Sequence, residues 1–153
     1  MHRVALLAFA AACGGGDDTI DRTFDPCALA ITTTATGVQR AGIDAAVALW
    51  GFAPDDGATP ILVRFEEAAP AFHGVYEDEI GEVVINERIT DPRALSIVIA
   101  HELGHAFGLP HVGGRASLMN TGNLSIEPTV EDRADVSALW GSCDARLRSS
   151  RPR

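Results

Sequence analysis

One stretch, residues 101–111, decides how the rest of the chain is interpreted, and it reads HELGHAFGLPH. Residues four apart on an α-helix project from nearly the same face, so His101 and His105 can share one metal ion. Imidazole nitrogens suit zinc, with bonds of roughly 2.0–2.1 Å. Glu102 leaves the helix in another direction, from which its carboxylate can reach a metal-bound water without being a ligand.

The end of this stretch extends the pattern to a third histidine. A straight helix would carry the next side chains off the shared face, so the chain has to turn back. Gly108 permits a left-handed helix end because it has no Cβ, and Pro110 prevents the helix from resuming. His111 is therefore expected to return to the metal as the third ligand. Three protein ligands leave a fourth position for water, as in catalytic zinc sites.

The run HExxHxxGxxH is followed by Ala116–Asn120, which carries Met119. Together these residues resemble the metzincin zinc metallopeptidases, nearest to the matrixin-like branch, in which a methionine turn lies beneath the metal. The resemblance implies an α+β catalytic domain: a small twisted mixed sheet with three helices and an active-site cleft below the edge strand. It also implies a zinc-dependent endopeptidase, in which a zinc-activated water attacks a peptide bond and Glu102 is the general base.

Two other functions are compatible with the same residues. The domain could be a zinc-bearing binding module without turnover, or a zinc hydrolase acting on a non-peptide amide. Glu102 argues against the first alternative, because metal binding alone does not require that carboxylate. The resemblance argues against the second.

Composition excludes several other classes of protein. The chain has 153 residues, enough for one domain, and a formal net charge of −9. The sequence has no basic patch with interleaved aromatic residues, so we expect no nucleic-acid partner. We expect a monomer that acts on a protein or peptide. The acidic turn Glu77–Glu79 has the oxygen ligands that calcium prefers but no calcium-loop spacing, so we expect it to be solvated and zinc to be the single cofactor.

The N-terminus predicts export. Residues 1–12 combine a short charged start with an apolar run from Val4 to Ala12, which is too short to span a membrane as a helix. Residues 9–13 end in Cys13 and resemble the lipobox of bacterial lipoproteins, which implies lipidation of Cys13 and anchoring at the bacterial cell envelope. The alternative is an ordinary signal peptide and a secreted protein. Residues 13–28 then form the anchor and flexible tether, 29–145 the catalytic domain, and 146–153 a disordered basic tail.

The cysteine count supports this interpretation. If Cys13 carries lipid, Cys27 and Cys143 remain as a pair, and an exported chain meets an oxidising compartment in which disulfides persist. The alternative makes Cys27 an inhibitory thiolate on the zinc, as in the matrixin propeptide switch. The residues around Cys27 do not match that switch, so we favour the disulfide.

Periodicity predicts the remaining elements. Val38, Ile43, Val47 and Trp50 recur at helical spacing between Thr36 and Gly51. Strands are predicted at 61–65, 71–76 and 82–86. By order, residues 72–76 form the edge strand above the cleft, where metzincins pair with an extended substrate.

Two further helices have start signals. Asp91 and Pro92 are a good N-cap and first residue for the helix that carries the histidines. Thr129 to Asp132 resembles a capping box. We expect that last helix to bury Val136, Leu139 and Trp140 and to end at Gly141.

Overall fold

The computed structural model describes residues 20–53 and 58–143. The predicted export signal, Cys13 and the predicted tail 146–153 lie outside these ranges. Packed structure begins before residue 29, because Phe24 is buried and its backbone N–H donates to the Ala106 carbonyl at 2.7 Å. Among the helices within the described ranges, none has the length and apolar character needed to cross a membrane.

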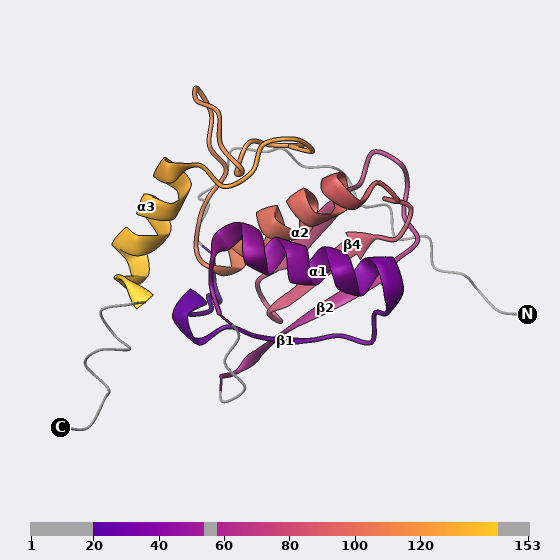
Figure 1. The fold of residues 1–153 in the computed structure, drawn as a ribbon, viewed down its shortest axis with the longest axis horizontal. Coiled ribbons are helices and arrows are strands. Elements are labelled where there is room, and N and C mark those ends of the chain that lie inside the picture. Colours follow the sequence, from indigo (N-terminus) through magenta and orange to yellow (C-terminus); the bar gives the residue numbers. More distant parts are fainter. Residues whose placement is uncertain (1–19, 54–57, 144–153) are drawn as a thin grey trace, which may run out of the picture.

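The architecture is α+β, with one four-stranded mixed sheet in the order β1-β2-β4-β3. The strands are β1 (Ala30–Thr32), β2 (Pro60–Glu66), β3 (Gly74–Glu77) and β4 (Glu82–Asn86). Strands β1, β2 and β4 run parallel, and β3 pairs antiparallel with β4 at one edge. This confirms the predicted mixed sheet, of which Figure 1 labels β1, β2 and β4. The edge strand is Gly74–Glu77, where residues 72–76 were predicted.

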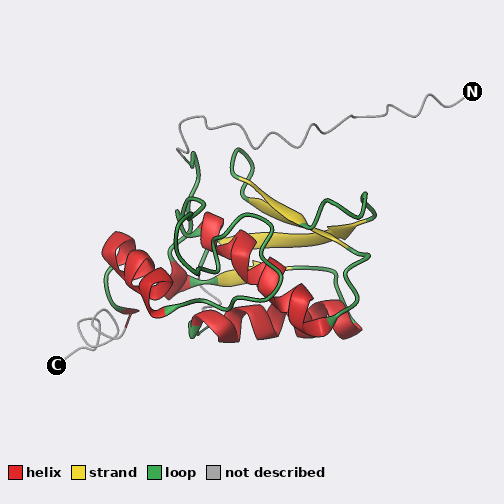
Figure 2. Ribbon diagram, turned by 90° about the horizontal axis from the view of Figure 1, so that it is seen from above, coloured by secondary structure: helices red, strands yellow, loops and turns green. Residues whose placement is uncertain are grey.

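Three helices complete the domain: α1 (Gly37–Trp50), α2 (Pro92–Ala106) and α3 (Val130–Trp140), with a short 3-10 turn at Pro26–Ala28. Helix α2 packs against β3 and β4, and α1 packs against α2, so both lie on one side of the sheet (Figure 2). The indole Nε1 of Trp50 donates to the Ala100 carbonyl at 2.9 Å and joins the two helices inside the core. Helix α2 is therefore held between the sheet and α1.

Two details of these elements differ from the sequence analysis. Strand β1 was not predicted, since three residues are too few to show an alternating pattern. Leu139 was expected to pack inward, yet it is 58% exposed, as is Val38, the first of the residues at helical spacing in α1. Each lies within two residues of a helix end, where the neighbouring elements no longer cover that face. Val136 is buried as expected, and Trp140 is partly buried.

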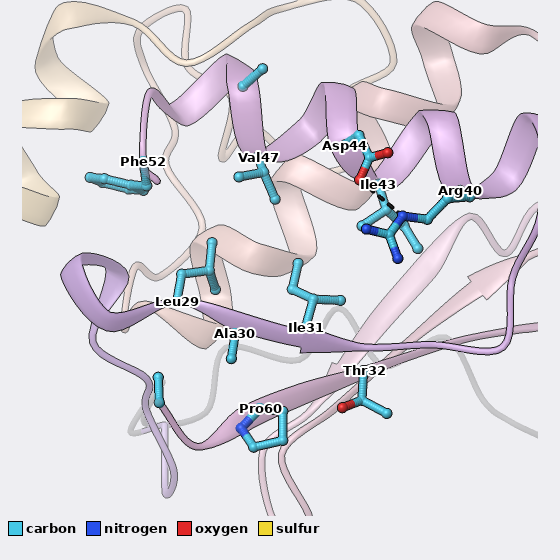
Figure 3. Close-up of a pocket in the computed structure, with 12 residues that line it drawn as sticks. Leu29, Ala30, Ile31, Thr32, Arg40, Ile43, Asp44, Val47, Phe52 and Pro60 are labelled. Atoms are coloured by element: carbon cyan, nitrogen blue, oxygen red, sulfur yellow. Dashed lines mark hydrogen bonds and ion pairs between the residues drawn. The ribbon is translucent and has the colours of Figure 1, made fainter. Parts of the chain in front are cut away.

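An open groove lies between β1 and α1, at the edge of the sheet opposite to β3 (Figure 3). Its walls are mainly apolar and include Ile31, Ile43 and Val47. The charged pair Arg40 and Asp44 at its rim is one turn apart on α1 and joined at 3.0 Å. The groove is also lined by Phe52 and Ala58, which lie on either side of the segment 53–57.

A disulfide joins Cys27 to Cys143, across 116 positions of sequence. This confirms the predicted pair and excludes Cys27 as a thiolate on the metal site. Because the bond closes nearly the whole described fold as one loop, it restricts the unfolded chain far more than the folded one. Loop-closure entropy gives a stabilisation of about 5 kcal/mol for a loop of this size.

Replacing both Cys27 and Cys143 by serine should therefore lower the free energy of unfolding by up to about 5 kcal/mol. The measurement is urea unfolding at equilibrium, with the oxidised wild type as reference. The reduced wild type is the control and should unfold at the same urea concentration as the double variant. Equal stability of oxidised wild type and double variant would contradict the expectation.

Candidate metal centre

Helix α2 begins as the sequence predicts. The Asp91 side chain accepts a hydrogen bond from the Ala94 backbone N–H at 2.7 Å, and Pro92 is the first helical residue. Leu95 and every residue from Ser96 to Gly104 is buried. The two histidines of the helix therefore project from a rigid, fully packed segment, which fixes their positions better than a loop would.

The end of α2 turns the chain back toward its own histidines. Gly108 has φ +96°, a conformation that favours glycine, and its N–H donates to the His105 carbonyl at 2.8 Å. The Leu109 N–H donates to the Gly104 carbonyl at 3.0 Å, which completes the cap. The chain then returns with His111 facing the helix, as expected from the spacing.

The three histidines form one group. The Nε2 atom of His111 lies 3.3 Å from Nε2 of His101 and 3.3 Å from Nε2 of His105. Tetrahedral zinc with bonds of 2.0–2.1 Å requires ligand nitrogens about 3.3–3.4 Å apart. The spacing therefore fits a zinc ion at the centre of the three. A search of the described ranges for clusters of histidine, cysteine or acidic side chains that could hold a metal ion finds these three histidines.

Backbone carbonyls determine which nitrogen of two rings is free. Nδ1 of His101 faces the Leu118 carbonyl at 2.7 Å, and Nδ1 of His105 faces the Leu109 carbonyl at 2.8 Å. A carbonyl oxygen only accepts hydrogen bonds, so each Nδ1 carries the proton. The Nε2 lone pairs of both rings are then directed at the shared centre, which is the arrangement of metal-ligating histidines.

Burial keeps these imidazoles neutral. It lowers the pKa of His105 to about 3, with further lowering by the neighbouring His101 and His111. It also lowers the pKa of His101, against the opposing effect of the hydrogen bond to Leu118. A neutral imidazole is the form that binds a metal, so both ligands are ready at neutral pH.

Glu102 lies beneath the edge strand and is only 7% exposed. A Cβ built on Gly74 would come within 3.2 Å of its Cγ, so β3 lies directly against this side chain. Burial raises the pKa of Glu102 to about 8, while the Tyr76 backbone N–H acts in the opposite direction. A dication bound at the histidines would favour the ionised carboxylate.

Met119, the residue of the predicted methionine turn, packs against helix α2 at Gly104. It is fully buried, and a Cβ built on Gly104 would come within 2.4 Å of its sulfur. Gly104 lies between Glu102 and His105 on α2, so the missing side chain provides the space in which the methionine packs. The Val112 N–H donates to the Met119 carbonyl at 2.9 Å and ties this turn to the residue after His111.

Gly104→Ala should therefore destabilise the domain although alanine is the better helix former. The helical gain of about 1 kcal/mol is outweighed by overpacking of about 1–3 kcal/mol in a site with no free space. Thermal unfolding measures the change. Gly113→Ala is the matched control, because nothing lies within 4 Å of its added Cβ. An unchanged or higher melting temperature for Gly104→Ala would contradict this packing.

Sequence reasoning missed the role of Asp132, which was expected only as part of the helix cap. It does complete the capping box with Thr129, but its carboxylate also accepts from Ser117 Oγ at 2.5 Å and from the Leu118 N–H at 2.8 Å. Burial alone would raise its pKa, but the bonds from Ser117, Thr129 and Leu118 lower it to about 2. Asp132 is thus a buried charge that anchors the methionine turn.

Comparison with known proteins gives one partial match. No protein-family model matches the chain. A segment of 51 residues is 39% identical to matrix metalloproteinase-21 of Homo sapiens. This segment covers 31% of the present chain and 9% of the length of that protein. The similarity and the three-histidine group together indicate a metzincin-like zinc site.

Proposed function

We propose that this protein is a zinc-dependent endopeptidase of the metzincin type, nearest to the matrixins. The observation that carries the proposal is the convergence of three imidazole Nε2 atoms at zinc spacing beside a buried carboxylate, Glu102, that is not one of the ligands. The partial match to a matrix metalloproteinase supports the same class of enzyme. A site built only to store or bind zinc would have no need of that carboxylate.

His101, His105 and His111 would hold the zinc ion, which supplies Lewis-acid polarisation of the scissile carbonyl when bound. Glu102 accepts the proton of the attacking water on its carboxylate and delivers it to the leaving amine. A dication held at the histidines favours the ionised carboxylate, which is the form of Glu102 that can accept a proton. Its place beneath β3 keeps it beside a substrate lying along that strand.

The edge strand offers backbone groups to such a substrate. The Asn86 N–H donates to the His73 carbonyl at 2.9 Å, so residue 73 faces β4. Backbone groups alternate along an antiparallel strand, and those of Gly74 and Tyr76 therefore face the open edge. An extended peptide can add to that edge by main-chain hydrogen bonds. Because Gly74 contacts Glu102, the peptide would be placed next to the proposed base.

Cleavage of casein by the purified full chain tests this function. We expect hydrolysis that stops when a chelator removes the metal and returns when zinc is added. A chain that binds zinc but leaves casein intact would instead be a binding module. Zinc-dependent hydrolysis of small amides without peptide cleavage would identify a different hydrolase.

For the location, we propose an exported protein anchored through lipid on Cys13. The apolar run from Val4 to Ala12 supports it, as does the bond between Cys27 and Cys143, which accounts for the other two of the three cysteines. Stable anchoring requires more than one acyl chain, as bacterial lipoproteins carry.

Fractionation of cells expressing Cys13→Ala tests this anchor. The variant should lose the membrane association of the wild type. A wild type found only in the soluble fraction would refute the anchor.

A further inference from the structure

The backbone N–H and the backbone carbonyl of Leu118 are both hydrogen-bonded to side chains. Its carbonyl accepts from His101 Nδ1 at 2.7 Å and from Asn123 Nδ2 at 3.0 Å. Its N–H donates to Asp132 Oδ2 at 2.8 Å. Leu118 itself is fully buried. The backbone of this one residue, through two consecutive peptide units, therefore connects a proposed metal ligand to two polar side chains, one from the loop after Met119 and one from helix α3.

Each of these two side chains is itself held in place. The Asp132 side chain is 1% exposed and pairs with Arg115 at 3.0 Å, in addition to its bonds from Ser117 and Thr129. The second Nδ2 hydrogen of Asn123 is directed at the Ile126 carbonyl at 2.7 Å, and its Oδ1 accepts from the Ile126 N–H at 2.8 Å. Neither side chain can turn away from Leu118 without breaking several bonds.

We propose that Asp132 and Asn123 are positioning residues for the metal: by holding the backbone on both sides of Leu118 Cα they fix the ring of His101 with its Nδ1 protonated and its Nε2 on the ion. Neither residue touches the metal centre. The inference rests on the proposed zinc site and is independent of whether the protein cleaves peptides.

The expected effect follows from how such partners act in metal sites. The hydrogen bond at the far nitrogen of a ligating histidine fixes its orientation and tautomer, and losing that support weakens metal binding about 10–100-fold. Here the acceptor is a backbone carbonyl, which no substitution can remove. The position of this carbonyl depends on the side chains that bond the backbone of Leu118, so these are the residues that substitutions can test.

The chain provides a matched control for Asp132. Asp135 lies one turn further along α3 and pairs with the same Arg115, at 2.9 Å, but its side chain is 55% exposed and, within the part of the chain that the structure describes, it does not bond the backbone of Leu118. Asp132→Asn and Asp135→Asn therefore each remove one negative charge from the same helix and one ion pair with Arg115. Only the first disturbs the backbone of Leu118.

The experiment measures zinc affinity of the full chain at neutral pH by competition with a chromophoric chelator. We expect Asp132→Asn and Asn123→Ala each to weaken zinc binding about 10–100-fold, and Asp135→Asn to stay within about twofold of wild type. In the zinc-loaded wild type, nitrogen-15 NMR should show His101 as one Nδ1-protonated form. In Asp132→Asn that signal should shift or broaden, which a purely structural role for Asp132 would not require.

Asn123→Ala decides the matter if Asp132→Asn does not fold, because Asn123 is half-buried in a loop and lies outside α3. Wild-type zinc affinity in every folded variant of these two residues would overturn the proposal. A wild type that binds zinc tightly but does not cleave casein would refute the proposed function and leave this inference in place.

Discussion

Glu102→Gln should abolish most peptidase activity, lowering kcat by a factor on the order of 10² or more, while the protein keeps its zinc. The amide has nearly the same shape as the acid but cannot accept the proton of the attacking water. Since burial already raises the pKa of Glu102 to about 8, glutamine resembles the protonated form that the protein accommodates without metal. We therefore expect the melting temperature of the metal-free variant to match that of the wild type.

The measurement is casein or peptide cleavage at saturating substrate, with zinc content determined by mass spectrometry on the same sample. Glu79→Gln is the control, because it makes the same chemical change on an exposed turn and should leave turnover unchanged. If Glu102→Gln turns over at the wild-type rate with zinc bound, Glu102 is not the base and the proposed mechanism is wrong.

His111→Ala should remove the metal rather than the base. Two imidazoles from α2 would remain, and they cannot complete a three-ligand catalytic site. We expect zinc affinity to fall on the order of 10²-fold or more, beyond the loss typical of a supporting hydrogen-bond partner. Activity should be lost with the metal. Because His111 is exposed and stands in a loop, the fold should survive the change.

Zinc retained after dialysis, measured by mass spectrometry, decides this prediction. His73→Ala is the matched control: it removes a half-buried histidine that belongs to no group able to hold a metal within the described part of the chain. Full zinc occupancy and normal cleavage in His111→Ala would exclude His111 from the ligand set.

The metal centre could be predicted from sequence because its parts are local. Asp91 and Pro92 mark the helix start, Gly108 marks its end, and the spacing of three histidines needs only helix geometry. The helix over residues 37–50 and the strand over 82–86 were predicted for the same reason, since their patterns are long and regular.

The remainder depends on contacts between distant segments. Strand β1 has only three residues, and it is a strand because it pairs with β2; its own sequence has no strand pattern. The bonds of Asp132 reach back 14 and 15 positions to Leu118 and Ser117, and no spacing rule connects a helix N-terminus to a turn so far upstream. Gly104 is a second example of a long-range contact. Only the packing of Met119 against helix α2 shows that a side chain at position 104 has no room.

The bond between Cys27 and Cys143 holds these two positions side by side, with 5.1 Å between their Cα atoms. A single cut of the backbone anywhere between the two cysteines would therefore leave both pieces covalently joined until the disulfide is reduced. The same bond that limits the unfolded chain thus keeps a nicked chain in one piece, together with its proposed metal centre.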